Sequence, residues 1–110
     1  MADNGQLKCD IVSYPCFKIE PDAQKIVHDN EKYINKYVNH FKIGGYKIVL
    51  DGSPQCKTAW LSKPYQGEKE YCGYPWLEDE EVQKYVDIAV DEKMQLLTHC
   101  NGDAAGDQFL

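Results

Sequence analysis

The chain has 110 residues, of which 43% are hydrophobic, so it is long enough for one domain that buries a core. Its formal net charge of −6 at pH 7 disfavours nucleic acid and anionic membranes as partners, because their phosphate groups would repel it. The opening MADNGQLKCD lacks the features of a signal peptide and no apolar run approaches the roughly 20 residues that span a bilayer, so we expect a cytoplasmic protein.

The first part of the chain predicts a strand and a helix. Residues 8–14 form a β-branched, partly alternating run that ends at Tyr14-Pro15, which is typical of a strand. Residues 29–41 place apolar side chains at the i, i+3, i+4 and i+7 positions of one face and precede a Gly-Gly pair, which predicts an amphipathic helix. The apolar residues of this face are Ile34, Tyr37, Val38 and Phe41.

A second strand and a long loop follow. The segment YKIVLDG, residues 46–52, is a short β-rich run closed by an Asp-Gly pair. Residues 53–77 are rich in Gly, Pro and aromatic side chains, and a loop of this length is more typical of a lid or binding loop than of a simple connection. We therefore expect residues 53–77 to lie over a site.

The last part predicts a helix, a strand and the start of another helix. Residues 77–93 carry apolar residues on one face and acidic residues in the first turn, where the helix dipole favours them. Residues 94–100 predict a third strand, and a turn then opens a helix with Asp103 as its N-cap. This order of elements is that of parallel βαβ units, so the predicted fold class is α/β.

The sequence lacks several common chemical motifs. It contains no Gly-rich phosphate loop, no GxSxG elbow, no HExxH and no CxxC. An odd number of cysteines without ligand spacing predicts reduced thiols, not a disulfide framework or a zinc ribbon. The cysteines are Cys9, Cys16, Cys56, Cys72 and Cys100.

Two residues stand where parallel α/β proteins gather ligands, which is at the carboxyl ends of strands. His99 ends the third predicted strand, although a purely structural histidine fits the same position. Lys47 shares a strand face with Asp51. On an edge strand that face is simply solvated, whereas in a closed barrel both charges would point inward and need a partner or a metal. Exposure or a helix end is enough to explain His28 and His40.

Two stretches together resemble a known family. YKIVLDGSPQCKTAWLSKPY and LLTHCNGDAAGDQFL, in this order, resemble the YtcJ-like branch of the metal-dependent amidohydrolase superfamily, and LKCDIVSYP is similar to the strand that precedes them there. The resemblance covers essentially the whole chain. It departs at Cys56, where glycine is frequent, and at Gly106, where a helix-forming residue is usual.

The resemblance implies a (β/α)8 TIM barrel with a metal site at the carboxyl ends of its strands. His99 matches the metal-binding histidine of the fifth strand. Lys47 corresponds to the bridging group of the fourth strand, where carboxylation by CO2 would turn the ammonium group, which has no lone pair, into an anionic ligand. Without that modification Asp51 is the next candidate. The implied cofactor is a divalent metal ion, zinc by the family's example.

The implied reaction is hydrolysis of an amide-type carbon–nitrogen bond in a small-molecule substrate by metal-activated water. The long loop would cover the pocket, and the resemblance implies that Asp103 caps the helix after His99. The implied substrate contacts are Asp51, Gln55, Thr58 and Trp60.

A complete barrel of this kind needs about 250 residues, so residues 1–110 would supply only about three of its eight parallel strands with their helices. The other ligands and the catalytic aspartate would lie outside this segment. We therefore expect a fragment of a catalytic barrel domain that contains no catalytic residue of its own and is inactive in isolation. Its exposed strand edges predict self-association.

Two other functions fit the same sequence. One is a small non-catalytic α/β binding module, in which the aromatic-rich loop recognises a partner and His99 is structural. The other is a thiol or metal sensor that uses Cys72, Cys100 and His99, although these thiols lack motif spacing.

Overall fold

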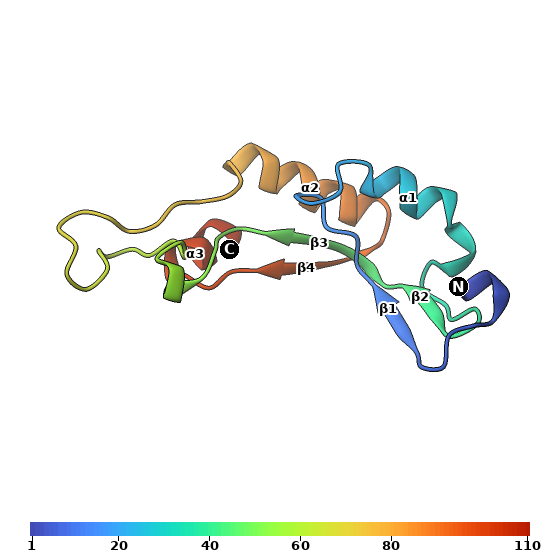
Figure 1. Cartoon of the computed structure of the whole chain (residues 1–110). Helices are drawn as coiled ribbons and strands as arrows, with labels where there is room; N and C mark the ends of the chain where they lie inside the picture. Colours follow the sequence, from blue (N-terminus) through green and yellow to red (C-terminus); the bar gives the residue numbers. More distant parts are fainter. The chain divides into compact units, whose positions relative to one another are not determined.

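Four strands and three α-helices follow one another along the chain, and the computed structural model describes all of residues 1–110 (Figure 1). The strands are β1 (Ile11–Ser13), β2 (Phe41–Ile43), β3 (Gly45–Val49) and β4 (Gln95–His99). The α-helices are α1 (Ala23–Asp29), α2 (Asp79–Asp91) and α3 (Asp103–Phe109). The short 3-10 helices are η1 (Ala2–Asn4), η2 (Glu31–Tyr33) and η3 (Pro54–Cys56). None of the α-helices is both long and apolar enough to cross a membrane.

The chain divides into two compact units. Unit 1 comprises Met1–Lys47 and Asp87–Leu97, and unit 2 comprises Ile48–Val86 and Thr98–Leu110. Each unit is therefore built from two separate stretches of sequence, and β3, α2 and β4 each contain a point where the chain passes from one unit to the other.

The strands pair in two two-stranded sheets, β1 with β2 and β3 with β4. The first pair is parallel, with Ile11 opposite Phe41. This pairing joins strands that are separated by α1, as expected for a βαβ unit.

The second pair is parallel as well. At the start of β3 the backbone of Gly45 passes so close to β4 that an added Cβ would lie 1.9 Å from the Gln95 carbonyl oxygen. Just beyond the other end, the Leu50 N–H donates to the His99 carbonyl over 2.9 Å. The first residue of β3 therefore lies beside the first residue of β4, and the carboxyl ends of the two strands lie beside each other. This means that β3 and β4 run in the same direction. The predicted α/β class with parallel strands is confirmed, with four short strands instead of about three.

The amphipathic helix predicted over residues 29–41 is wrong. After Asp29, where α1 ends, only η2 is helical there, and Asn35, Asn39 and His40 have φ of 56°, 50° and 67°. These left-handed residues stop a right-handed helix, and asparagine adopts this conformation more readily than most residues. Val38 instead forms an antiparallel β-bridge with Phe41. The apolar residues that were predicted to share a helix face therefore take part in extended backbone pairing.

The α-helix of this region lies earlier, at α1, where no element was predicted. Ala23 and Val27, four residues apart, are both fully buried. Lys25 and Asp29 form an i, i+4 ion pair of 2.5 Å on the exposed side. The buried face of α1 thus consists of only two residues, Ala23 and Val27, and their burial in unit 1 stabilises the helix.

Glu92 joins separate segments of unit 1. Its carboxylate accepts hydrogen bonds from the Tyr46 hydroxyl at 2.5 Å and the Gln24 amide at 2.8 Å, and lies 3.1 Å from His28 Nε2. Desolvation acts to raise the pKa of the Glu92 carboxyl, but these hydrogen bonds together outweigh it, so the net pKa is lowered. The carboxylate thus remains ionised as a shared acceptor.

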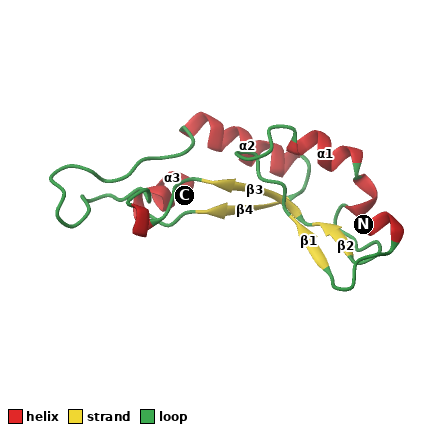
Figure 2. Ribbon diagram, viewed as in Figure 1, coloured by secondary structure: helices red, strands yellow, loops and turns green.

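The helix and the strands predicted for the second half of the chain are confirmed. The helix predicted over residues 77–93 is α2, and the third strand is β4. Ile48 and Leu50 are fully buried, whereas Lys47 and Val49 are half-buried, which is the predicted alternation of faces. Residues 57–78 contain neither helix nor strand, as Figure 2 shows.

Candidate functional site

The carboxyl ends of β3 and β4 meet in unit 2. Leu50 directly follows β3 and its N–H donates to the carbonyl of His99, the last residue of β4, over 2.9 Å. His99 is half-buried. Its position at a strand end, directly before a turn and α3, is the one predicted, and it is where parallel α/β folds bind ligands.

Asp51, the residue after Leu50, is fully buried. One carboxylate oxygen, Oδ2, accepts the backbone N–H groups of Gly102 at 2.7 Å and Trp60 at 2.9 Å. The other, Oδ1, accepts the backbone N–H of Asn101 at 2.8 Å. Three donors satisfy a charge that would otherwise be costly to bury. Asp51 therefore connects the end of β3, the long loop and the turn after His99.

The start of the long loop is closed by its own hydrogen bonds. The Gly52 N–H donates to the Thr58 carbonyl at 2.9 Å, and the Ser53 N–H donates to Thr58 Oγ1 at 2.9 Å. Gln55 is exposed and accepts a hydrogen bond of 2.6 Å from the Ser53 hydroxyl. Thr58 and Gln55, predicted as substrate contacts, thus have visible roles in shaping this turn.

Asp103 was predicted to be the N-cap of the last helix, but α3 begins one residue earlier than that prediction. The N-cap of α3 is Gly102, without a side-chain hydrogen bond, and Asp103 is the first helical residue. Its carboxylate instead accepts the Ser62 hydroxyl at 2.5 Å and the Ser62 N–H at 2.9 Å. These two hydrogen bonds lower the pKa of the Asp103 carboxyl. Its observed role is therefore to hold the long loop against the start of α3.

A cavity of about 510 Å³ lies beside this turn in unit 2. Lys63 is one of the residues that line it, and its exposed side chain forms no ion pair or hydrogen bond. The residues that line the cavity are Leu61, Ser62, Lys63, Pro64, Asn101 and Asp103.

Sequence reasoning missed Ser62, Lys63 and Asn101. The loop was expected to contact a substrate through Gln55, Thr58 and Trp60, none of which lines this cavity. The Asn-Gly pair after His99 and the Ser-Lys-Pro run in the loop were visible as turn signals. Turn signals do not say which turns lie together, so the cavity required the structure.

Lys47, the second predicted metal ligand, belongs to unit 1. Its backbone pairs with the segment after β1, because the Lys47 N–H donates to the Pro15 carbonyl at 2.9 Å and the Phe17 N–H donates to the Lys47 carbonyl at 3.1 Å. Its side chain is half-buried and forms no ion pair. His99 belongs to unit 2.

The chain's own side chains do not fit a complete metal site. No group of three or more His, Cys, Asp or Glu side chains is arranged to hold an ion. A catalytic zinc site needs three protein ligands. His99 is one donor, an unmodified Lys47 offers no lone pair, and both oxygens of Asp51 are occupied by N–H groups. These residues alone therefore do not form a catalytic metal site.

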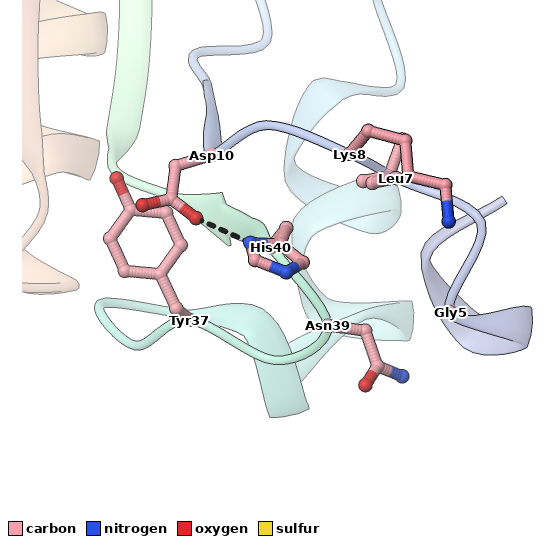
Figure 3. Close-up of a pocket in the computed structure, with 7 residues that line it drawn as sticks. All are labelled: Gly5, Leu7, Lys8, Asp10, Tyr37, Asn39 and His40. Atoms are coloured by element: carbon pink, nitrogen blue, oxygen red, sulfur yellow. Dashed lines mark hydrogen bonds and ion pairs between the residues drawn. The ribbon is translucent and has the colours of Figure 1, made fainter.

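A second cavity, of about 610 Å³, lies in unit 1 at the amino ends of β1 and β2 (Figure 3). His40 directly precedes β2 and Asp10 directly precedes β1, and His40 Nδ1 lies 2.8 Å from Asp10 Oδ1. Both side chains are more than half exposed. Ligands of parallel α/β proteins bind at the opposite, carboxyl, ends of strands. The residues that line it are Gly5, Leu7, Lys8, Asp10, Tyr37, Asn39 and His40.

Comparison with known proteins gives a consistent result. Residues 1–110 match the sequence model of the Amidohydrolase family. No curated protein sequence matches the chain. A crystal structure of an uncharacterized metal-dependent hydrolase from Pyrococcus horikoshii OT3 is similar with a TM-score of 0.81 and 26% identity over 97% of this chain. A second, from Pyrococcus furiosus, has a TM-score of 0.77 and 25% identity over 96% of this chain.

The chain spans only 21% and 22% of the length of these two structures. Both structures are of metal-dependent hydrolases, so this chain is similar to about one fifth of such a protein. Because the family model matches every residue from 1 to 110, the chain belongs to the amidohydrolase family.

Proposed function

We propose that residues 1–110 are part of the catalytic (β/α)8 barrel of a metal-dependent hydrolase of the YtcJ-like branch. The proposed reaction is hydrolysis of an amide-type carbon–nitrogen bond in a small-molecule substrate, with zinc as the metal. The family match over the whole chain supports the hydrolase assignment. The observation that carries the proposal is the position of His99 at the carboxyl end of β4, before a turn that a buried carboxylate holds.

In this proposal His99 contributes one metal ligand and the other ligands lie largely outside these residues. Lys47 contributes a second only after modification. Its neutral amine would add to CO2, forming a nitrogen–carbon bond and releasing one proton, to give a carbamate whose oxygens bind metal. The isolated segment is expected to be inactive, because one or two donors do not form a catalytic site.

The cavity beside the turn after His99 is the proposed place for substrate. Two charged groups line it, the Lys63 ammonium group and the Asp103 carboxylate, and the carboxylate is hydrogen-bonded to Ser62. A cation at the edge of a cavity favours a substrate with an anionic group, such as a carboxylate, at the end away from the bond that is cleaved.

The alternative of a non-catalytic binding module receives less support. In the aromatic-rich loop, the Tyr65 hydroxyl donates to the Ala59 carbonyl at 2.8 Å and the Tyr71 hydroxyl donates to the Lys57 carbonyl at 2.7 Å. The rings of Tyr65 and Tyr71 also stack, with centroids 6.0 Å apart. These contacts hold Tyr65 and Tyr71 within the loop, and the exposed aromatic side chains left for a partner are Tyr71 and Tyr74, at 41% and 47% exposure.

Self-association of the isolated segment is a further part of the proposal. Ile11 and Val12 of β1 are 38% and 39% exposed, and Leu97 of β4 is 36% exposed. Exposed apolar strand residues favour pairing with another chain.

The proposal is tested first by translating the DNA on both sides of these codons. Upstream sequence with a His-x-His strand, and downstream sequence with further histidines and an aspartate, would support it. Flanks with neither would overturn it in favour of the binding module.

The complete protein with Zn²⁺ then provides the functional test. His99→Ala is expected to lower kcat/KM for an amide-type substrate more than about 100-fold. His40→Ala, at an exposed histidine in unit 1, is the matched control and should leave the rate unchanged. Equal rates for the wild type and His99→Ala would remove His99 from the site.

A further inference from the structure

Asp51 is the one charged residue of the chain that is fully buried. No cation neutralises it, and its only partners are backbone N–H groups on residues 9, 50 and 51 positions away in sequence. Because an ionised carboxylate inside a protein is costly without donors, this arrangement persists only if all the donors remain in place. The buried carboxylate therefore fixes the positions of the backbone segments that supply the N–H donors.

Two of those donors belong to the turn that directly follows His99. Asn101 and Gly102 are the second and third residues after His99, and their N–H groups donate to different oxygens of Asp51. The Asn101 side chain adds a hydrogen bond of 2.8 Å to the Gly52 carbonyl. The backbone after His99 is thus held at three points to the end of β3.

The third donor brings in the long loop. The Trp60 N–H shares Oδ2 of Asp51 with Gly102. Trp60 and Gly102 pass so close that a Cβ on Gly102 would lie 1.7 Å from the Trp60 carbonyl oxygen. Glycine is therefore required where the turn meets the loop.

We infer that Asp51 is a positioning residue, which fixes the backbone turn after His99 and thereby the orientation of the His99 imidazole, and which contacts neither substrate nor metal. Both carboxylate oxygens are buried and occupied, so Asp51 has no free face for a ligand. Its relevance to catalysis rests on the proposed function, in which His99 binds the metal.

The first test measures reactivity at His99 without any assay of hydrolysis. Diethyl pyrocarbonate modifies accessible imidazoles, and mass spectrometry of peptides separates the three histidines. In the wild type the half-buried His99 should react more slowly than His28 and His40, whose side chains are 57% and 56% exposed. Asp51→Asn replaces one acceptor oxygen with an NH2 group, so the rate at His99 alone should rise about tenfold.

Hydrogen exchange provides the structural counterpart. The amides of Trp60, Asn101 and Gly102 should be protected in the wild type and should lose at least about tenfold protection together in Asp51→Asn. Protection within α2 reports whether the variant is folded. Unprotected amides in the wild type, or an unchanged His99 rate in the variant, would overturn the inference.

Two further variants separate this role from a general loss of stability. Gly102→Ala leaves the carboxylate intact but forces the turn away from Trp60, and should accelerate modification of His99 in the same way. Asp107→Asn removes an equal charge from an exposed position of α3 and should change neither rate nor protection. An effect of Asp107→Asn as large as that of Asp51→Asn would refute the inference.

Kinetics of the complete protein distinguish positioning from substrate contact. A positioning role predicts that Asp51→Asn lowers kcat with KM within about twofold, whereas a lost substrate contact raises KM. If the wild-type protein hydrolyses nothing, the proposed function fails. The modification and exchange measurements still decide whether Asp51 positions His99.

Discussion

The backbone N–H of Gly102 donates to the Asp51 carboxylate over 2.7 Å, which links the end of β3 to the start of α3 across 51 positions of sequence. In the sequence, Asp51-Gly52 and Asn101-Gly102 are both turn signals, and neither pair indicates that it contacts the other. The hydrogen bond between them joins the two turns at the carboxyl ends of the parallel strands β3 and β4.

The first prediction concerns the stability that this contact provides. Asp51→Asn keeps the size of the side chain but presents an amide group to backbone donors, and should lower the free energy of unfolding by about 3 kcal/mol. Asp107→Asn, on the exposed side of α3, should stay within about 0.5 kcal/mol of the wild type. Urea denaturation measures both values, and equal stability of the two variants would contradict the prediction.

Two glycines should respond in opposite directions to alanine. At Gly106, in α3, an added Cβ meets no atom within 4 Å, so Gly106→Ala should stabilise the chain by up to about 1 kcal/mol. At Gly45 the Cβ would collide with the Gln95 carbonyl, so Gly45→Ala should destabilise it by about 2 kcal/mol or more. Thermal unfolding compares them, and the same sign for both would be inconsistent with the structure.

Two tyrosine hydroxyl groups should contribute differently to the free energy of unfolding. Tyr46 is fully buried and donates to Glu92, whose side chain is only 22% exposed, so Tyr46→Phe should cost about 2 kcal/mol. Tyr33 donates to Asp3, whose side chain is 65% exposed, and water can replace that hydroxyl. Chemical denaturation should therefore show a smaller loss for Tyr33→Phe, and the reverse order would count against the burial argument.

A pH titration tests the contact between the long loop and α3. Hydrogen bonds from Ser62 lower the pKa of the Asp103 carboxyl. A lowered folded-state pKa means that the stabilisation is present above the ordinary aspartate value of about 3.9 and is lost as pH falls through the folded value. Ser62→Ala should raise the pKa of Asp103, measured by carboxyl ¹³C NMR. No change would mean that Ser62 does not bind this carboxylate in solution.

The last prediction concerns substrate charge and depends on the proposed function. Lys63→Met in the complete protein removes the unpartnered cation of the cavity while keeping an unbranched side chain. KM for substrates with a carboxylate should rise about tenfold, with little change for neutral analogues. Lys69→Met, elsewhere in the long loop and exposed, is the control. An equal change for charged and neutral substrates would exclude charge recognition by Lys63.

Local patterns predicted much of the chain. The acidic first turn and apolar face of α2, the run that forms β4 and the alternation of β3 all refer to neighbours in sequence, so they could be read directly. The same reasoning failed at residues 29–41. Asn35 and Asn39 adopt left-handed conformations there, and the apolar residues find extended partners instead of a helix face.

By itself the sequence determined the α/β class and the position of His99 at a strand end, because strand ends follow from local hydrophobic and turn signals. It also carried the signature of the family. Only the tertiary structure decided what Asp51 does. Its three donors lie 9, 50 and 51 positions away, and a carboxylate in the sequence gives no sign of which backbone N–H groups will surround it once it is buried.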